Sequence, residues 1–236
     1  MKTRLFLPFA VIGGLLTVSG AARAQLLTPT PYLSVTDSPF ASLPTVSGGY
    51  FFLEDVEDNL FNTPGVTFNG IVTSISFGLG TIVDSVDADD GAINGANGNA
   101  GVFGDSLFSN NSMTFDFNAT TLGTLPSHVG IVWTDGSNNI TFEVFDALGA
   151  SFGTVTGSHA DGNFNNGTAE DRFYGAINAG GISRITVSNP GGLELDHLQY
   201  GTLQNTVAVP EAGTLSLVGS ALGMLGVCIA RRRKTA

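Results

Sequence analysis

Short runs in which apolar and polar residues alternate dominate the middle of the chain. In residues 112–118, Met113, Phe115 and Phe117 alternate with Thr114 and Asp116. A period of two is typical of a β-strand with one buried face. Alternation of this kind, or a short apolar run as in residues 50–53 and 129–134, predicts further strands. They cover residues 50–53, 66–68, 71–79, 129–134, 140–145, 151–156, 171–176, 183–188 and 193–200.

Turn residues separate these runs. Residues 135–139 and 146–149 combine Asp, Asn, Ser and Gly, which predicts hairpins and therefore antiparallel neighbouring strands. Eight to ten short strands with frequent turns predict an all-β fold, a jelly-roll-like antiparallel β-sandwich over residues 49–204. Residues 25–48 contain four prolines, which lack the amide that a sheet requires, so we expect an extended lead-in with at most a short edge strand.

The first 24 residues have the pattern of a secretory signal peptide. Lys2 and Arg4 precede an apolar core, and Ala22 and Ala24 flank Arg23 in a small-x-small cleavage site. We expect signal peptidase to cut after Ala24, so that the mature, exported chain begins at Gln25.

The other end combines a short motif, an apolar segment and a basic cluster. After a linker at residues 205–208 come Val209, Pro210 and Glu211, then the 17 uncharged residues 214–230, and then Arg231, Arg232, Arg233 and Lys234. As a helix, residues 214–230 span roughly 25 Å, the short end of what crosses a bilayer. A basic cluster stays on the cytoplasmic side, so this C-terminal hydrophobic helix predicts a membrane span with the preceding domain on the far side.

Charge narrows the choice of partners. The chain has 20 acidic and 9 basic residues, and between the two end segments only Arg172 and Arg184 oppose 19 carboxylates. Nucleic acid is not expected as a partner, because binding it requires Lys and Arg to neutralise phosphates. The lone cysteine, Cys228, lies in the apolar tail, so the domain before it has neither a disulfide nor a thiol nucleophile.

The sequence carries no catalytic signature. His128, His159 and His197 share no metal-ligand spacing, and no Gly-x-Ser-x-Gly motif occurs. We therefore expect a non-enzymatic protein. Trp133 lies in an apolar run between Val132 and Thr134, where a core position is a better interpretation than a ligand platform.

Two acidic groups are candidate calcium sites, because calcium takes six to eight oxygen ligands. The first joins the carboxylates that follow an early strand with one in the last strand. The second, weaker group follows the predicted strand 71–79 and departs from the EF-hand pattern, because Gly91 stands where a ligand is required. The groups are Glu54, Asp55, Glu57, Asp58 and Asp196, and Asp84, Asp87, Asp89 and Asp90. The alternative for both is that acidic loops keep an exported protein soluble.

Taken together, the two ends resemble those of PEP-CTERM proteins, which are exported and sorted in Gram-negative and related bacteria. The 28 residues 209–236 carry the resemblance, with Pro210 and Glu211 as the recognition motif and Ala212 in place of the family's second proline. The resemblance implies that an exosortase-type transpeptidase removes the tail and that the protein reaches the cell surface or extracellular matrix. Residues 52–55 and 193–198 are also similar to the calcium-clipped edges of carbohydrate-binding sandwiches.

Three hypotheses follow. The first is an exported, non-enzymatic cell-surface or extracellular-matrix protein that is anchored in the membrane until its tail is processed. The alternative is a carbohydrate-binding module that retains matrix exopolysaccharide. The third is a secreted glycan-active enzyme. Calcium is the one cofactor expected, in a structural role.

Overall fold

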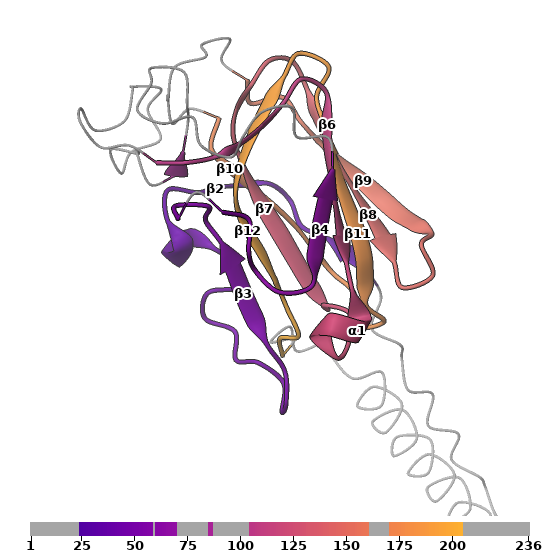
Figure 1. Cartoon of the computed structure of the whole chain (residues 1–236). Coiled ribbons are helices and arrows are strands. Elements are labelled where there is room, and N and C mark those ends of the chain that lie inside the picture. Colours follow the sequence, from indigo (N-terminus) through magenta and orange to yellow (C-terminus); the bar gives the residue numbers. More distant parts are fainter. Residues whose placement is uncertain (1–23, 59, 70–84, 87–103, 161–169, 205–236) are drawn as a thin grey trace, which may run out of the picture. The chain divides into compact units, whose positions relative to one another are not determined.

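The computed structural model describes residues 24–58, 60–69, 85–86, 104–160 and 170–204. In these residues the chain forms two antiparallel β-sheets, one 3-10 turn (η1, Val35–Asp37) and one short helix (α1, Ala119–Leu122). Asn118 caps α1 by accepting hydrogen bonds from the amides of Thr120 and Thr121 through its side chain. Figure 1 shows the two sheets facing each other, with β7 and β12 in one and β4, β8 and β11 in the other.

The first sheet has seven described strands in the order β1-β10-β7-β12-β3. Two short strands complete it, since β2 pairs with β10 and β5 pairs with β12. All nine residues of β7 and all nine of β12 are buried, which explains their lack of a clear polar face. The strands are β1 (Gln25–Leu26), β2 (Thr30–Pro31), β3 (Phe51–Glu54), β5 (Leu107–Ser109), β7 (His128–Gly136), β10 (Arg172–Ile177) and β12 (Leu193–Gly201).

The second sheet has five described strands in the order β4-β6-β11-β8-β9. In β6 every second residue is buried, beginning with Met113, and the residues between are partly exposed. One face of this sheet therefore packs on the core and the other lies open. The strands are β4 (Val66–Asn69), β6 (Ser112–Phe117), β8 (Ile140–Asp146), β9 (Ser151–Gly157) and β11 (Ile182–Ser188).

The main core lies between the sheets. It combines side chains such as Ile131 and Trp133 from the seven-stranded sheet with Phe115, Phe142 and Ile185 from the five-stranded one. Burial of these apolar side chains, at roughly 25 cal/mol per Å² removed from water, is the main contribution to folding.

A second apolar cluster covers the outer face of the seven-stranded sheet. Tyr32 and Phe40, from the proline-rich segment at the start, pack there with Val132 and Phe173. The ring of Phe173 lies against Gly130 of β7 and Gly175 of β10. A Cβ atom added at these glycines would lie 2.0 and 2.7 Å from the ring, respectively. Residues 25–48 were predicted to be only an extended lead-in. Instead they form a covering layer that contributes buried side chains of its own.

Every predicted strand that falls within the described residues is confirmed, with its ends shifted by at most two residues. The predicted strand 71–79 lies outside the described residues. One connection was predicted wrongly. The turn at residues 135–139 does not close a hairpin, because β7 and β8 belong to different sheets, whereas β8 and β9 do pair as a hairpin. The turn chemistry is local, and it does not distinguish a return along the same sheet from a crossing to the facing one. Residues 25–48 contain two short strands, β1 and β2, where at most one short edge strand was expected, and the short strand β5 and helix α1 were missed.

Candidate functional site

The acidic loop after β3 is organised by a buried carboxylate. Glu54, at the end of β3 and opposite Leu198 of β12, is 4% exposed. One of its oxygens accepts a hydrogen bond from the amide of Val56 at 3.1 Å, and the other accepts from the amides of Asn62 and Thr63 at 2.8 and 2.9 Å. Three main-chain amides thus satisfy one buried charge, and the loop closes around it. The closed loop places Val56 in the left-handed region, with φ 52°, a strained conformation for a β-branched residue.

The other three carboxylates of this loop also accept main-chain hydrogen bonds. Asp55 accepts from the amide of Glu57 at 3.3 Å, and Asp58 accepts from the amide of Leu60 at 2.9 Å. Glu57 reaches further along the chain and accepts from the amide of Asp105 at 2.6 Å. The acidic loop is therefore joined to the segment that leads into β5.

The fifth predicted ligand, Asp196, lies at an irregularity of β12. The register with β7 shifts between Asp196 and Gln199, and His197 has φ 47°. One carboxylate oxygen of Asp196 accepts from the hydroxyl of Ser85 at 3.0 Å and the amide of Val86 at 3.1 Å. Asp196 thus holds a distant segment of chain on β12.

The structure brings the β3 loop and β12 together, as the first candidate site requires. Within the described ranges, however, no three His, Cys, Asp or Glu side chains are grouped so that they could hold a metal ion. The second candidate group (Asp84, Asp87, Asp89 and Asp90) lies outside the described residues, although Ser85 and Val86, within it in sequence, are described. Calcium binding stays a prediction from the sequence.

A chain of buried hydrogen bonds links the covering segment to the irregularity in β12. The hydroxyl of Ser38 donates to Oε1 of Gln199 at 2.5 Å, and Nε2 of Gln199 donates to the hydroxyl of Tyr32 at 2.8 Å. The hydroxyl of Tyr32 also shares a hydrogen bond with Nδ1 of His197, 2.9 Å away.

Trp133 is fully buried in the main core and donates from Nε1 to the carbonyl of Asp135 at 2.6 Å, which confirms the prediction of a core position. Of the three histidines, His128 and His197 are buried in different strands, and His159 follows β9. Burial, and then the nearby charge of Arg172, lower the pKa of His159 below its usual value.

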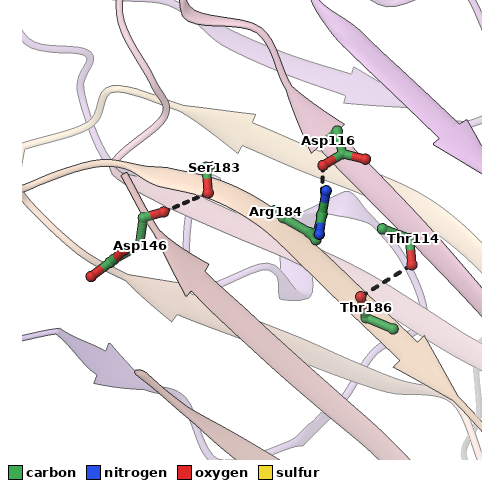
Figure 2. Close-up of polar contacts among 6 residues, drawn as sticks. All are labelled: Thr114, Asp116, Asp146, Ser183, Arg184 and Thr186. Atoms are coloured by element: carbon green, nitrogen blue, oxygen red, sulfur yellow. Dashed lines mark hydrogen bonds and ion pairs between the residues drawn. The ribbon is translucent and has the colours of Figure 1, made fainter. Parts of the chain in front are cut away.

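A cleft at one end of the open sheet was not predicted. It has a volume of about 340 Å³ and lies where β6 and β8 end and β11 begins. Its lining combines a charged pair, apolar side chains and the β8–β9 turn: Asp116, Phe117, Phe145, Ala147, Leu148, Gly149, Ser183 and Arg184. Figure 2 shows Arg184 pointing toward Asp116 and Ser183 toward the backbone of Asp146.

Arg184 is the central side chain of this cleft. Its Nε donates to Oδ1 of Asp116 across the strand pair at 2.6 Å, and its guanidinium carbon lies 5.7 Å from the ring centre of Phe145 on the other side. The side chains of Arg184 and Asp116 are 47% and 36% exposed, so solvent screens the pair and reduces its contribution to stability. The cleft thus presents a charged donor and a charged acceptor to solvent.

The turn between β8 and β9 forms the rim. Oδ1 of Asp146 accepts from the amides of Leu148 and Ala150, both at 2.9 Å, and Ser183 donates to the carbonyl of Asp146 at 2.5 Å. These bonds hold the turn against β11 while the side chain of Leu148 stays 92% exposed.

Two β-bulges flank the end of β8. The register of β11 with β8 shifts between Ile182 and Arg184, and that of β8 with β9 shifts between Val144 and Phe145. Bulges change the direction of side chains, and here the shift leaves Ser183 and Arg184 both at the cleft. One signal in the sequence was available, since Arg184 is one of only two basic residues between the end segments.

The residues of the predicted processing signals lie outside the described ones. This applies to Ala22, to the motif Val209, Pro210 and Glu211, and to Arg231, Arg232 and Arg233. Ala24 is described as an exposed residue just before β1. Among the described helices none is long and apolar enough to span a bilayer, and residues 214–230 are not among them.

Comparison of the chain with protein-family models, with curated proteins and with solved structures finds no significant match.

Proposed function

We propose that this chain is an exported, non-enzymatic cell-surface or extracellular-matrix protein that is processed through its C-terminal PEP-CTERM-type sorting signal. The sequence motifs at the two ends suggest the route. Signal peptidase acts after Ala24, the apolar helix holds the protein in the membrane transiently, and an exosortase-type transpeptidase then cuts near Pro210 and Glu211.

One structural observation supports this proposal: the two boundaries of the sandwich fall next to the two predicted processing points. Gln25 already pairs with Ile177, so β1 begins at the first residue of the expected mature chain. At the other end Leu203 forms a bridge to Thr45, and the amide of Gln204 donates to the carbonyl of Pro44 at 2.9 Å. Removing either end segment would therefore leave every described strand pair in place.

The sandwich is proposed to be of the jelly-roll kind. From β6 to β12 the chain crosses between the two sheets at five of its six connections, and only β8 and β9 follow one another in the same sheet. Repeated crossing of this kind is typical of jelly rolls and other Greek-key sandwiches.

Mass spectrometry of the protein purified from the surface of the producing bacterium tests the proposal. The expected mature chain begins at Gln25 and ends between Pro210 and Ala212. The variant Glu211→Gln should keep its tail, and Glu143→Gln, the same change at a partly exposed position of β8, should be processed normally. An intact tail through Arg231 to Ala236 in the wild-type protein would instead identify an ordinary membrane anchor.

The alternative function, retention of matrix exopolysaccharide, is favoured by the cleft at Arg184. A glycan-active enzyme is the third candidate, and turnover of a polysaccharide by the purified chain would favour it.

A further inference from the structure

The outer face of the five-stranded sheet differs from the outer face of the seven-stranded sheet. The covering segment with Tyr32 and Phe40 packs on the outer face of the seven-stranded sheet, whereas the outer face of the five-stranded sheet shows a regular alternation of buried and partly exposed positions. Its outward side chains are mostly small and hydroxyl-bearing, as in the cross-strand pair of Thr114 and Thr186, whose Oγ1 atoms are 3.1 Å apart (Figure 2).

These polar side chains lie in rows across the strands. Arg184 is opposite Asp116 on one side and Phe145 on the other, and Thr186 is opposite Thr114 and Glu143. Neighbouring strands are about 4.8 Å apart, so a row across five strands extends roughly 19 Å. The cleft at Arg184 lies at one end of this polar surface and is continuous with it through Asp116 and Thr114 of β6.

The charged pair in the cleft keeps bonding capacity for a ligand. Among the described residues, Asp116 bonds Arg184 through Oδ1 and Nε only. This leaves Oδ2 of Asp116 as an acceptor and the two terminal nitrogens of Arg184 as donors. A carboxylate and a guanidinium side by side can bond adjacent hydroxyl groups, one accepting from a hydroxyl and the other donating to its neighbour.

The rim adds an apolar contact. Leu148 is 92% exposed, and the hydrogen bonds of Asp146 and Ser183 hold the backbone of its turn in position. The ring of Phe145 lines the same cleft. Polar groups that fix orientation beside exposed apolar surface are the general composition of sites for small polar molecules.

We propose that this cleft binds sugar residues of a neutral polysaccharide, with Asp116 and Arg184 as the hydrogen-bonding pair and Leu148 as the apolar contact. The charge of the domain favours a neutral polysaccharide over a charged one. The domain carries 19 carboxylates against two arginines, so its field repels a polyanionic chain, while Arg184 in the cleft disfavours a metal cation. This proposal rests on the alternative function given above, retention of matrix exopolysaccharide, and assigns that binding to particular residues.

Affinity electrophoresis of the purified full-length chain, in non-denaturing gels with a non-ionic detergent, tests this site. The gels contain a soluble β-glucan, a galactomannan, dextran or the anionic polysaccharide alginate. We expect at least one neutral polysaccharide to slow migration and alginate to have less effect. Asp116→Asn and Leu148→Ser should each raise the dissociation constant, by about tenfold for Asp116→Asn, since a hydrogen bond to a charged group contributes that much.

Leu60→Ser and Asp37→Asn are the matched controls, because they make the same chemical changes at exposed positions that do not line the cleft, and they should bind as the wild-type chain does. Thermal melting of each variant separates lost binding from lost fold, and Leu148→Ser, in a fully exposed side chain, should melt as the wild type. The proposal is overturned if no neutral polysaccharide slows the wild-type chain, if alginate binds more tightly, or if both cleft variants bind normally. None of these results bears on tail processing, which the mass measurement tests separately.

Discussion

The hydroxyl of Tyr32, in the segment that covers the seven-stranded sheet, lies 2.9 Å from Nδ1 of His197 in β12, a contact that spans 165 residues of sequence. Both side chains are buried, and their rings meet edge to face with centres 5.6 Å apart. The contact ties the covering segment to the one residue of β12 with a positive φ. The irregular part of β12 is therefore stabilised by the beginning of the domain.

Tyr32→Phe should destabilise the domain by about 1–3 kcal/mol, because Gln199 and His197 lose their shared buried partner. Denaturant unfolding of the full chain measures the loss. Tyr50→Phe is the control, since the hydroxyl of this half-buried side chain donates to the carbonyl of Thr124 in a solvent-exposed hydrogen bond, whose loss should cost less. Equal losses in the two variants would contradict a special role for the buried chain of hydrogen bonds.

Gly130→Ala tests the close approach of Phe173 to the seven-stranded sheet. The added Cβ would lie 2.0 Å from the ring, so the covering layer must shift, and we expect a loss of about 1–3 kcal/mol in the free energy of unfolding. Gly180→Ala, where the nearest atom is an Asn178 side-chain oxygen at 3.3 Å, should change stability much less. The double variant Gly130→Ala with Phe173→Leu should recover part of the loss, and no recovery would exclude the ring as the cause.

Alkaline pH should weaken the fold through its tyrosines. Burial raises the pKa of Tyr200 to about 12, and it also raises the pKa values of Tyr50 and Tyr174. Between pH 10 and 12 the unfolded chain loses these protons before the folded one does. The contribution of these tyrosines to stability is therefore constant below about pH 10 and is lost above it. A titration followed by tyrosinate absorbance should show delayed ionisation that becomes normal on unfolding, whereas ionisation of all four tyrosines near pH 10 in the folded protein would contradict the assignment.

Calcium at the β3 loop remains to be tested by ion removal. If the carboxylates near Glu54 and Asp196 bind calcium, millimolar calcium should raise the melting temperature by several degrees and EDTA should reverse the change, because a bound ion stabilises the native state by mass action. Asp55→Asn should reduce the shift, and Asp37→Asn, an acidic residue of the covering segment, should not. An unchanged melting temperature in calcium would remove this site.

The local pattern of the sequence was sufficient to predict most of the described strands and the all-β class. In β6, β8 and β11 apolar and polar residues alternate because one face of each strand is buried and the other is open. This pattern can be seen in each strand by itself. The position of Trp133 in the core followed in the same way, from the apolar residues around it.

Tertiary structure decided which sheet each strand joins and what surrounds each polar side chain. The turn after β7 has the residues of a hairpin, yet the chain crosses to the facing sheet, because burial of both faces of β7 depends on strands from distant parts of the sequence. The cleft depends in the same way on Asp116, Phe145 and Arg184 from three strands, joined by cross-strand register and two bulges. Register and burial come from long-range pairing, so a linear pattern of hydrophobicity does not determine them.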